Sequence, residues 1–168
     1  MAESTILRTK RDGQIVISDN AGANSYTLAY EPGDFSYTIP DQTTVNTLDR
    51  GIFGATPSLR PGDDQPMTLG FSAHQRDVGD TGGVYATLED ILYRYTGGYV
   101  DTNWVSTMGA NADFFTVTVA LTIDGAIAGE ADKTLTFNFV RLTGGASEGD
   151  PNVVTVSGTA YALRPVLS

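Results

Sequence analysis

The chain has 168 residues, of which 40% are apolar and 18% are charged, and twenty acidic residues against ten basic ones give a formal net charge of −10. Such a chain is long enough for one domain with a real core, and its charge argues against adhesion to nucleic acid or to an anionic membrane. The lack of cysteine excludes disulfides, thiolate metal sites and a cysteine nucleophile. No window approaches about 18 apolar residues, so we expect neither a signal peptide nor a membrane span.

The N-terminal part of the chain predicts short strands joined by turns. Runs of β-forming residues at 14–18 and 25–30 are separated by the turn-forming cluster DNAGAN, so they predict a hairpin. A third strand is expected over 35–40, FSYTIP. Residues 41–66 follow with three Gly and three Pro and no period along most of their length. We expect a long structureless loop there, and loops of that length in compact domains usually serve binding.

The rest of the chain predicts further strands and one helix. Apolar and polar residues alternate from Met67 to His74, which predicts a strand with one buried face. Strong strands are also expected over 114–124, 133–143 and 152–163. Four apolar residues between them recur at helical spacing, with Thr87 as the N-cap: Leu88, Ile91, Leu92 and Tyr95. The expected fold is therefore mainly β, a β-sandwich or partly open barrel with one flanking α-helix, in a single domain over 1–168.

The polar faces of the later strands are rich in threonine and poor in charge, and the carboxylates cluster in turns instead. The threonines concerned include Thr116, Thr118, Thr134 and Thr136. Exposed strand faces and edges usually carry Lys and Glu, which discourage pairing with other chains. Two interpretations stay open. Threonine is simply a good strand former, or these faces pair between subunits or line a lumen.

The sequence predicts no enzyme, no cofactor and no metal site. His74 is the only histidine, and Ser72 beside it does not belong to a nucleophile-elbow pattern, so the pair is interpreted as a surface or interface pair. Asp63 and Asp64 are adjacent on extended chain and therefore point to opposite faces, which does not suit an acid/base pair. Trp104, the only tryptophan, is a candidate for a sugar-stacking platform together with nearby tyrosines.

Five segments follow one another along the chain: GDFSYT (33–38), LDRG (48–51), RPGDD (60–64), MTLGFS (67–72) and EGDPNVVTVSGTAY (148–161). Together, and in this order, they resemble the tail tube proteins (major tail proteins) of long-tailed, non-contractile bacteriophages. The chain is also distantly similar to the tube proteins of type VI secretion.

The resemblance implies a structural virion protein of the phage tail, made in the host bacterial cytoplasm. Hexameric rings would stack into a tube whose inner wall is one larger β-barrel, and genomic DNA would pass through it without specific binding. The implied partners are other copies of the chain, a tape-measure protein in the lumen, and the tail tip and tail terminator proteins, with no membrane insertion. The long loop at 41–66 would contact neighbouring subunits through Asp49, Arg50, Ile52, Phe53, Leu59, Arg60, Asp63 and Asp64.

One alternative stays open: a carbohydrate-binding or adhesin-like β-sandwich of a virion or cell surface, with Trp104 and tyrosines as the binding platform.

Overall fold

The computed structural model describes residues 13–20, 24–28, 34–51, 54–75, 88–93, 104–109, 113–125 and 131–168. This part of the chain is mainly β, with a single short helix. The elements, in chain order, are β1 (Gly13–Ser18), β2 (Ser25–Leu28), β3 (Ser36–Thr38), β4 (Thr44–Gly51), β5 (Gly54–Pro61), β6 (Met67–His74), α1 (Leu88–Tyr93), β7 (Val117–Ile123), β8 (Lys133–Ser147), β9 (Val153–Ala160) and β10 (Val166–Leu167).

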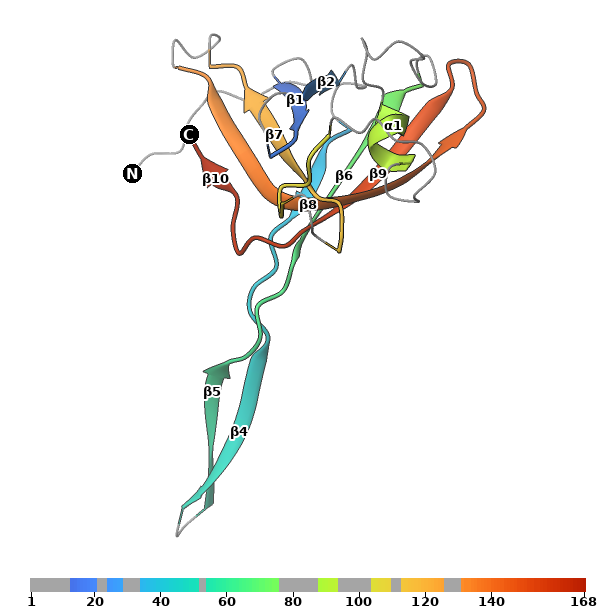
Figure 1. The fold of residues 1–168 in the computed structure, drawn as a ribbon. Coiled ribbons are helices and arrows are strands. Elements are labelled where there is room, and N and C mark those ends of the chain that lie inside the picture. The colour runs from blue at the N-terminus through green and yellow to red at the C-terminus, as the bar shows by residue number, and fades with distance from the viewer. Residues whose placement is uncertain are drawn as a thin grey trace.

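Two antiparallel sheets organise the described strands. The larger has the order β2-β1-β7-β8-β9-β6-β3, with β10 pairing β8 beside that path, and the smaller contains only β4 and β5. The large sheet is strongly bent, with α1 on its inner side, and the β4–β5 hairpin projects away from it (Figure 1). The sheet does not close into a barrel. The prediction of a mainly β, partly open architecture with one flanking helix is confirmed for the described residues.

The expectation of a structureless loop over 41–66 is wrong. Most of that segment forms β4 and β5, which pair in register from Thr44↔Pro61 to Gly51↔Gly54. The segment shows no apolar alternation along most of its length, and this is why the sequence pattern missed the two strands. The other expected strands are present, and β1 and β2 form the predicted hairpin.

Strand β8 is the longest element, and it bends where it changes partners. Its first half pairs with β7 and its second half with β9, and Val140 lies opposite both Val117 and Ala160. Just before that point β8 contains one residue more than β7, and Phe139 adopts a φ of 54°. A bulge of this kind bends a strand and increases its twist. The bend turns the two halves of the sheet toward each other.

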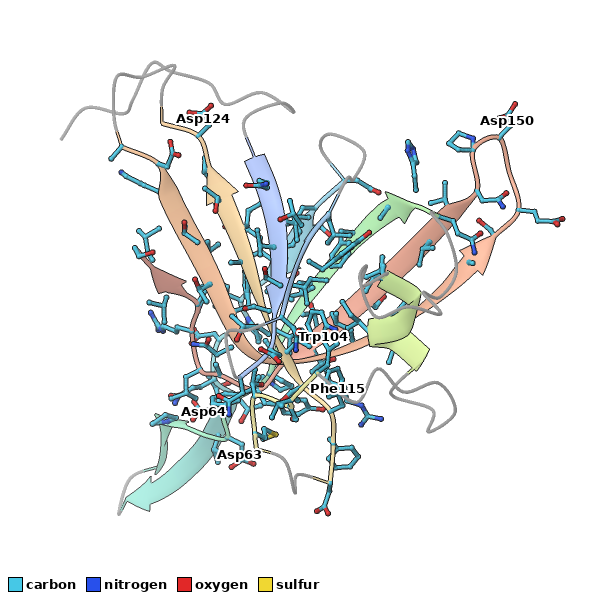
Figure 2. The ribbon with its side chains drawn as sticks, turned by 45° about the horizontal axis from the view of Figure 1, so that its top comes forward. Asp63, Asp64, Trp104, Phe115, Asp124 and Asp150 are labelled. Carbon is cyan, nitrogen blue, oxygen red and sulfur yellow. The ribbon has the colours of Figure 1, made fainter. Side chains whose placement is uncertain are left out.

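Trp104 is buried in the body of the molecule (Figure 2). Its segment is held by the buried carboxylate of Asp19, which accepts a hydrogen bond from the Val105 backbone N–H at 3.2 Å. The backbone N–H of Asn20 donates to the Val105 carbonyl at 3.1 Å. These bonds tie residues 104–106 to the end of β1, so Trp104 belongs to the core and cannot form a surface platform.

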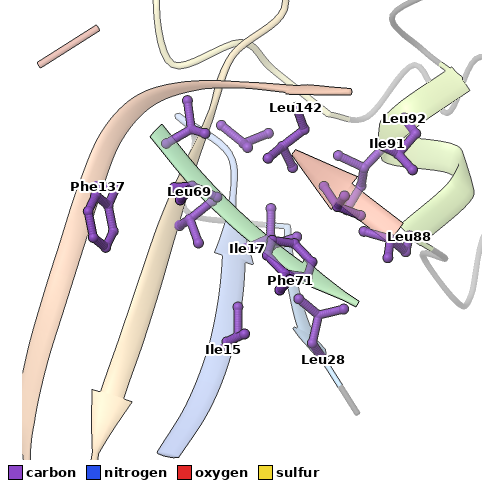
Figure 3. Packing of buried hydrophobic residues seen from close by; sticks show 14 of the residues in the cluster. Ile15, Ile17, Leu28, Leu69, Phe71, Leu88, Ile91, Leu92, Phe137 and Leu142 are labelled. Atoms are coloured by element: carbon purple, nitrogen blue, oxygen red, sulfur yellow. The ribbon is translucent and has the colours of Figure 1, made fainter. Parts of the chain in front are cut away.

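The core fills the concave side of the bent sheet (Figure 3). Ile15 and Ile17 of β1 are fully buried, and the predicted apolar stripe of α1 supplies three buried side chains: Leu88, Ile91 and Leu92. Tyr95, the fourth predicted member of that stripe, lies outside the described residues. Every second residue of β6 is also buried, as the alternation predicted.

An aromatic cluster connects β3, at one edge of the large sheet, to β8 on the opposite side of the core. The ring of Tyr37 lies 5.5 Å from that of Phe137, and Phe35 stacks on Phe71 with ring centroids 6.2 Å apart. Such pairs contribute about 0.5–1.5 kcal/mol beyond their buried area. The cluster holds β3 against β8 across the core, although these two strands are not neighbours in the sheet.

Within the described part of the chain, no helix is both long and apolar enough to cross a membrane.

We expect Gly158→Ala to destabilise the fold. A Cβ at Gly158 would lie 2.7 Å from Leu69 Cδ1 and 2.9 Å from Val140 Cγ1, whereas a Cβ at Gly145 would meet no atom within 4 Å. Overpacking of a core typically costs about 1–3 kcal/mol. Urea unfolding should show this loss for Gly158→Ala and a change below about 0.5 kcal/mol for the control Gly145→Ala. Equal stability of the two variants would contradict the packing described for this position.

Candidate assembly surfaces

The β4–β5 hairpin, called the arm from here on, is the most unusual surface of the described chain. Its two strands pair with each other and with no other described strand. At roughly 3.4 Å per residue, eight residues extend about 27 Å, and Figure 1 shows the arm pointing away from the large sheet. An isolated two-stranded hairpin is at best marginally stable in water. The arm is therefore suited to contact with another molecule.

Hydrogen bonds fasten the root of the arm. The Thr43 backbone N–H and Oγ1 both donate to the Asp63 carbonyl, at 3.0 and 3.1 Å. The Gly62 N–H donates in return to the Thr43 carbonyl. Beside them, Gln42 Nε2 donates to Asp64 Oδ1 at 2.6 Å. These bonds continue the pairing of β4 and β5 below the hairpin, so the arm leaves the body as a paired ribbon.

The predicted contact residues are distributed along the arm and its root. Asp49 and Arg50 lie on β4, opposite Thr56 and Ala55, close to the turn. Leu59 and Arg60 lie on β5 near the root. Ile52 and Phe53 lie outside the described residues.

The predicted pair Asp63 and Asp64 has a structural part at the root, where Asp64 contributes its carboxylate and Asp63 its backbone carbonyl. Both residues are exposed. Figure 2 shows them at one end of the body, with the carboxylates of Asp124 and Asp150 at the other.

The outer, convex face of the large sheet is a second candidate surface, called the hydroxyl face below. The register aligns Thr118 with Ser18, Thr122 with Thr134, and Ser157 with Thr143. Among the described strands of this sheet, Arg141 and His74 are the only titratable side chains on the face. The other members are mainly Ser, Thr and Gly: Ser18, Ser25, Thr27, Ser36, Thr38, Thr68, Gly70, Ser72, Thr118, Thr122, Thr134, Thr136, Thr143, Gly145, Ser147, Thr155, Ser157 and Thr159.

Several of these hydroxyl groups are already hydrogen-bonded within the sheet. Thr122 Oγ1 lies 3.3 Å from Thr134 Oγ1, and Thr143 Oγ1 donates to the Ser157 carbonyl at 3.3 Å. Soluble proteins usually carry charge on roughly a quarter to a third of their surface residues. A large face with almost no charge is therefore suited to burial against other subunits, or to lining a space through which a charged polymer moves.

Three of the four singled-out threonines lie on the hydroxyl face, and Thr116 does not. Thr118, Thr134 and Thr136 are half-buried members of β7 and β8. Thr116 precedes β7, is buried, and its Oγ1 lies 2.7 Å from Thr107 Oγ1 and 3.2 Å from Ser106 Oγ. Since this network holds the segment after Trp104 against the start of β7, the side chain of Thr116 serves the fold. The prediction that Thr116 belongs to an open strand face is therefore wrong.

The described residues offer little chemistry. Ser72 and His74 share the outer face of β6, as predicted, opposite Thr155 and Val153. No group of three or more His, Asp or Glu side chains in the described part of the chain could hold a metal ion.

Sequence reasoning missed a third feature, an exposed apolar strip at the C-terminal end of the chain. Leu163 is 68% exposed and Leu167 65% exposed, and Tyr161 and Val166 are also exposed. The strip runs beside β8, which β10 pairs at Thr136 and Leu135. The alternation of apolar and polar residues could not reveal this strip, because both residues of β10 are exposed and neither face of the strand is buried.

No family model and no curated protein matches the chain. Six chains of solved structures match it, two tube terminators among them. The sheath/tube terminator of the extracellular contractile injection system PVC, in the extended state, superposes with a TM-score of 0.52 at 11% identity, covering 100% of this chain and 99% of its own. The tube-terminating cap of the anti-feeding prophage AFP gives 0.52 and 11%, covering 100% and 94%. The chain thus has the fold of tube terminators. At this identity the likeness concerns the fold alone.

We expect Thr118→Lys with Thr136→Lys to prevent assembly while leaving the fold intact. Lysine can extend from half-buried positions to water, so the melting temperature should change by less than about 5 °C. In an assembly, however, each copy would add two like charges to a face that carries almost none. Electron microscopy and thermal melting measure the two effects. The control Thr118→Ser with Thr136→Ser keeps both hydroxyls and should assemble, and normal tubes from the lysine variant would mean that these positions stay solvated.

Proposed function

We propose that this chain is the structural subunit of a tail tube, of the kind found in long-tailed, non-contractile bacteriophages. Copies assemble as hexameric rings, the rings stack, and the tube conducts the viral genome into the host cell. The arm carries this proposal, because it is a preformed hairpin that leaves the body and pairs with no described strand of the large sheet. The tube-terminator fold and the resemblance of the sequence to tail tube proteins support it.

The charge of the chain suits a conduit for DNA. Six copies of a chain with a formal charge of −10 carry −60 per ring. Like charges repel the phosphate backbone, and a face of hydroxyl groups offers no cluster of cations to hold it. The genome can therefore pass without binding. On assembly, the bent sheets of neighbouring subunits join into a larger inner barrel, which covers the edges of their terminal strands.

The proposed partners follow from this role. They are other copies of the chain, a tape-measure protein in the lumen, and the tail tip and terminator proteins at the two ends of the tube. The protein is made in the host cytoplasm and functions in the virion, as a non-enzymatic component.

A second candidate is a tube terminator. One observation favours it: the two terminators with this fold are matched over almost their entire lengths. A terminator forms one ring and stops growth, whereas a tube protein adds ring upon ring. Negative-stain microscopy of the purified chain distinguishes them, because long tubes support the tube protein and single rings that cap separately prepared tubes support the terminator. Monomers that bind a glycan array would instead support the adhesin-like alternative, which has lost Trp104 as its platform.

We expect removal of the arm to abolish polymerisation and to leave the body folded. Since Thr43 and Gly62 are hydrogen-bonded across the root, an Asn-Gly turn can join them in place of residues 44–61. The body should melt within about 5 °C of the full chain, because the arm forms a separate sheet. Sedimentation velocity should detect only small species. Tubes of normal length from this variant would contradict the role given to the arm.

A further inference from the structure

The two edges of the arm differ in their capacity for hydrogen bonding. In an antiparallel ladder, residue pairs that exchange two backbone hydrogen bonds alternate with pairs that exchange none. Gly51 lies opposite Gly54 with two residues between them along the chain, and a pair at this spacing in a hairpin is a bonded pair. Counting from it, Leu48↔Pro57 and Thr44↔Pro61 are non-bonded pairs. This assignment agrees with the presence of Pro57 and Pro61 in these two pairs, because proline has no N–H to donate.

Residues of the non-bonded pairs point their backbone groups outward, to the outer edges of the arm. On β5 the outward positions are Ala55, Pro57, Leu59 and Pro61, so two of the four N–H groups are missing. On β4 they are Thr44, Asn46, Leu48 and Arg50, and all four groups are present. Proline at an edge prevents further pairing. The arm is therefore blocked along β5 and open along β4.

The large sheet has an open edge of matching length. Val140 is the last residue of β8 that lies opposite β7, while pairing with β9 continues on the other side to Ser147. β7 pairs with one edge of β8 and β9 with the other. Along Leu142–Ser147 no described residue pairs with the edge on the β7 side. Residues 143–147 are exposed, and the segment has neither Pro nor Lys to protect it.

The side-chain hydrogen bonds of β8 show which of its backbone groups point to this edge. Thr143 Oγ1 and Ser147 Oγ donate to the carbonyls of Ser157 and Val153, so those carbonyls face β8. Thr143 and Ser147 therefore belong to the bonded pairs with β9. The alternate residues Gly144 and Ala146 direct their N–H and C=O groups away from β9, to the open edge.

Length favours this edge over the others of the described sheet. Strand β4 has eight residues, and the open part of β8 has six. The terminal strands β2 and β3 have four and three residues, and β10 has two. Only β8 can pair with most of β4.

The arm cannot reach the β8 edge of its own chain. In Figure 1 the arm points away from one end of the body, and the turn between β8 and β9 lies at the opposite end. The contact must therefore join two copies. Because two different surfaces meet, the interface is heterologous, and a head-to-tail contact of this kind repeats from one copy to the next.

We propose that β4 of one copy adds as an extra strand to the open edge of β8, at Leu142–Ser147, in a copy of the next ring. The interaction is strand addition, in which the main chain supplies the affinity. This proposal rests on the proposed tube function and specifies the contact by which rings stack.

Proline substitutions test the donor and acceptor edges. Asn46→Pro removes one outward N–H of β4 and leaves every β4–β5 hydrogen bond in place, and Ala146→Pro does the same at the edge of β8. Each should raise the concentration needed for polymerisation by about tenfold or more. Ala55→Pro is the matched control, because it alters the edge of β5 that is already blocked. Asn46→Ala controls for the side chain. Both controls should polymerise like the original chain.

Cysteine pairs test the contact without requiring a tube. The chain has no cysteine, so chains with Asn46→Cys and chains with Ala146→Cys can be mixed and oxidised. Thr44→Cys or Leu48→Cys, each mixed with Ala146→Cys, tests the neighbouring registers of the two strands. A disulfide-linked heterodimer that exceeds both homodimers in yield is the expected result. The control mixture of Ala55→Cys with Ala146→Cys should give no enrichment.

The outcomes separate this contact from the tube function. Two results would overturn the strand addition and leave the tube function standing. One is normal growth of tubes with Asn46→Pro, and the other is the absence of an enriched heterodimer from the cysteine mixtures of a chain that forms tubes. If the original chain forms no tubes at all, the tube function fails. The crosslinking of two copies in concentrated solution then still decides whether the edges pair, and an absence of enrichment there overturns the proposal.

Discussion

The backbone hydrogen bonds at strand edges are the constraint on which the account of this protein depends. A strand edge presents N–H and C=O groups that must be paired or hydrated, and proteins usually protect exposed edges with Lys, Pro, bulges or covering segments. Here the arm has prolines on one edge only, and the second half of β8 has no such protection. A chain that protects one edge and leaves its counterpart open is adapted to specific pairing with another copy.

The body of the protein provides the rigidity that such pairing needs. The bulge at Phe139 bends β8 and allows it to pair with β7 and β9 in succession, and the aromatic contacts of Tyr37 and Phe35 hold the two halves of the sheet around the core. The hydrogen bonds of Thr43 fix the base of the arm. The arm is thus already a hairpin when it meets a partner, so association costs less conformational entropy than ordering a flexible loop would.

Sequence patterns were sufficient for elements whose apolar residues recur at a regular spacing, and insufficient for the arm, where they do not. The alternation in Met67–His74 gave the bounds of β6 correctly, and the helical spacing of Leu88, Ile91 and Leu92 identified α1. The arm was missed because its sequence shows no alternating period along most of its length and because its prolines argue against a strand. Its register resolves that conflict, since Pro57 and Pro61 occupy outward positions.

Long-range contacts were equally invisible in the sequence. In the sequence Thr116 resembles the other threonines of its segment. In the structure it precedes β7, and its hydroxyl group is hydrogen-bonded to those of Ser106 and Thr107. Asp19 holds their segment in place through the backbone N–H of Val105. Only the tertiary arrangement separates this buried threonine from Thr118 two residues later. The edge of β8 could not be foreseen either, because it depends on where β7 begins relative to Val140.

Hydrogen exchange resolved to single amides tests the central claim most directly. In the dispersed chain, the outward amides of β4 (Thr44, Asn46, Leu48 and Arg50) should exchange at nearly the rate of an unstructured peptide. In the assembled state they should be strongly protected together with Gly144 and Ala146, while the amides of Ala55 and Leu59 on the edge of β5 should gain little. Equal protection of both edges of the arm, or no gain on assembly, would contradict the account.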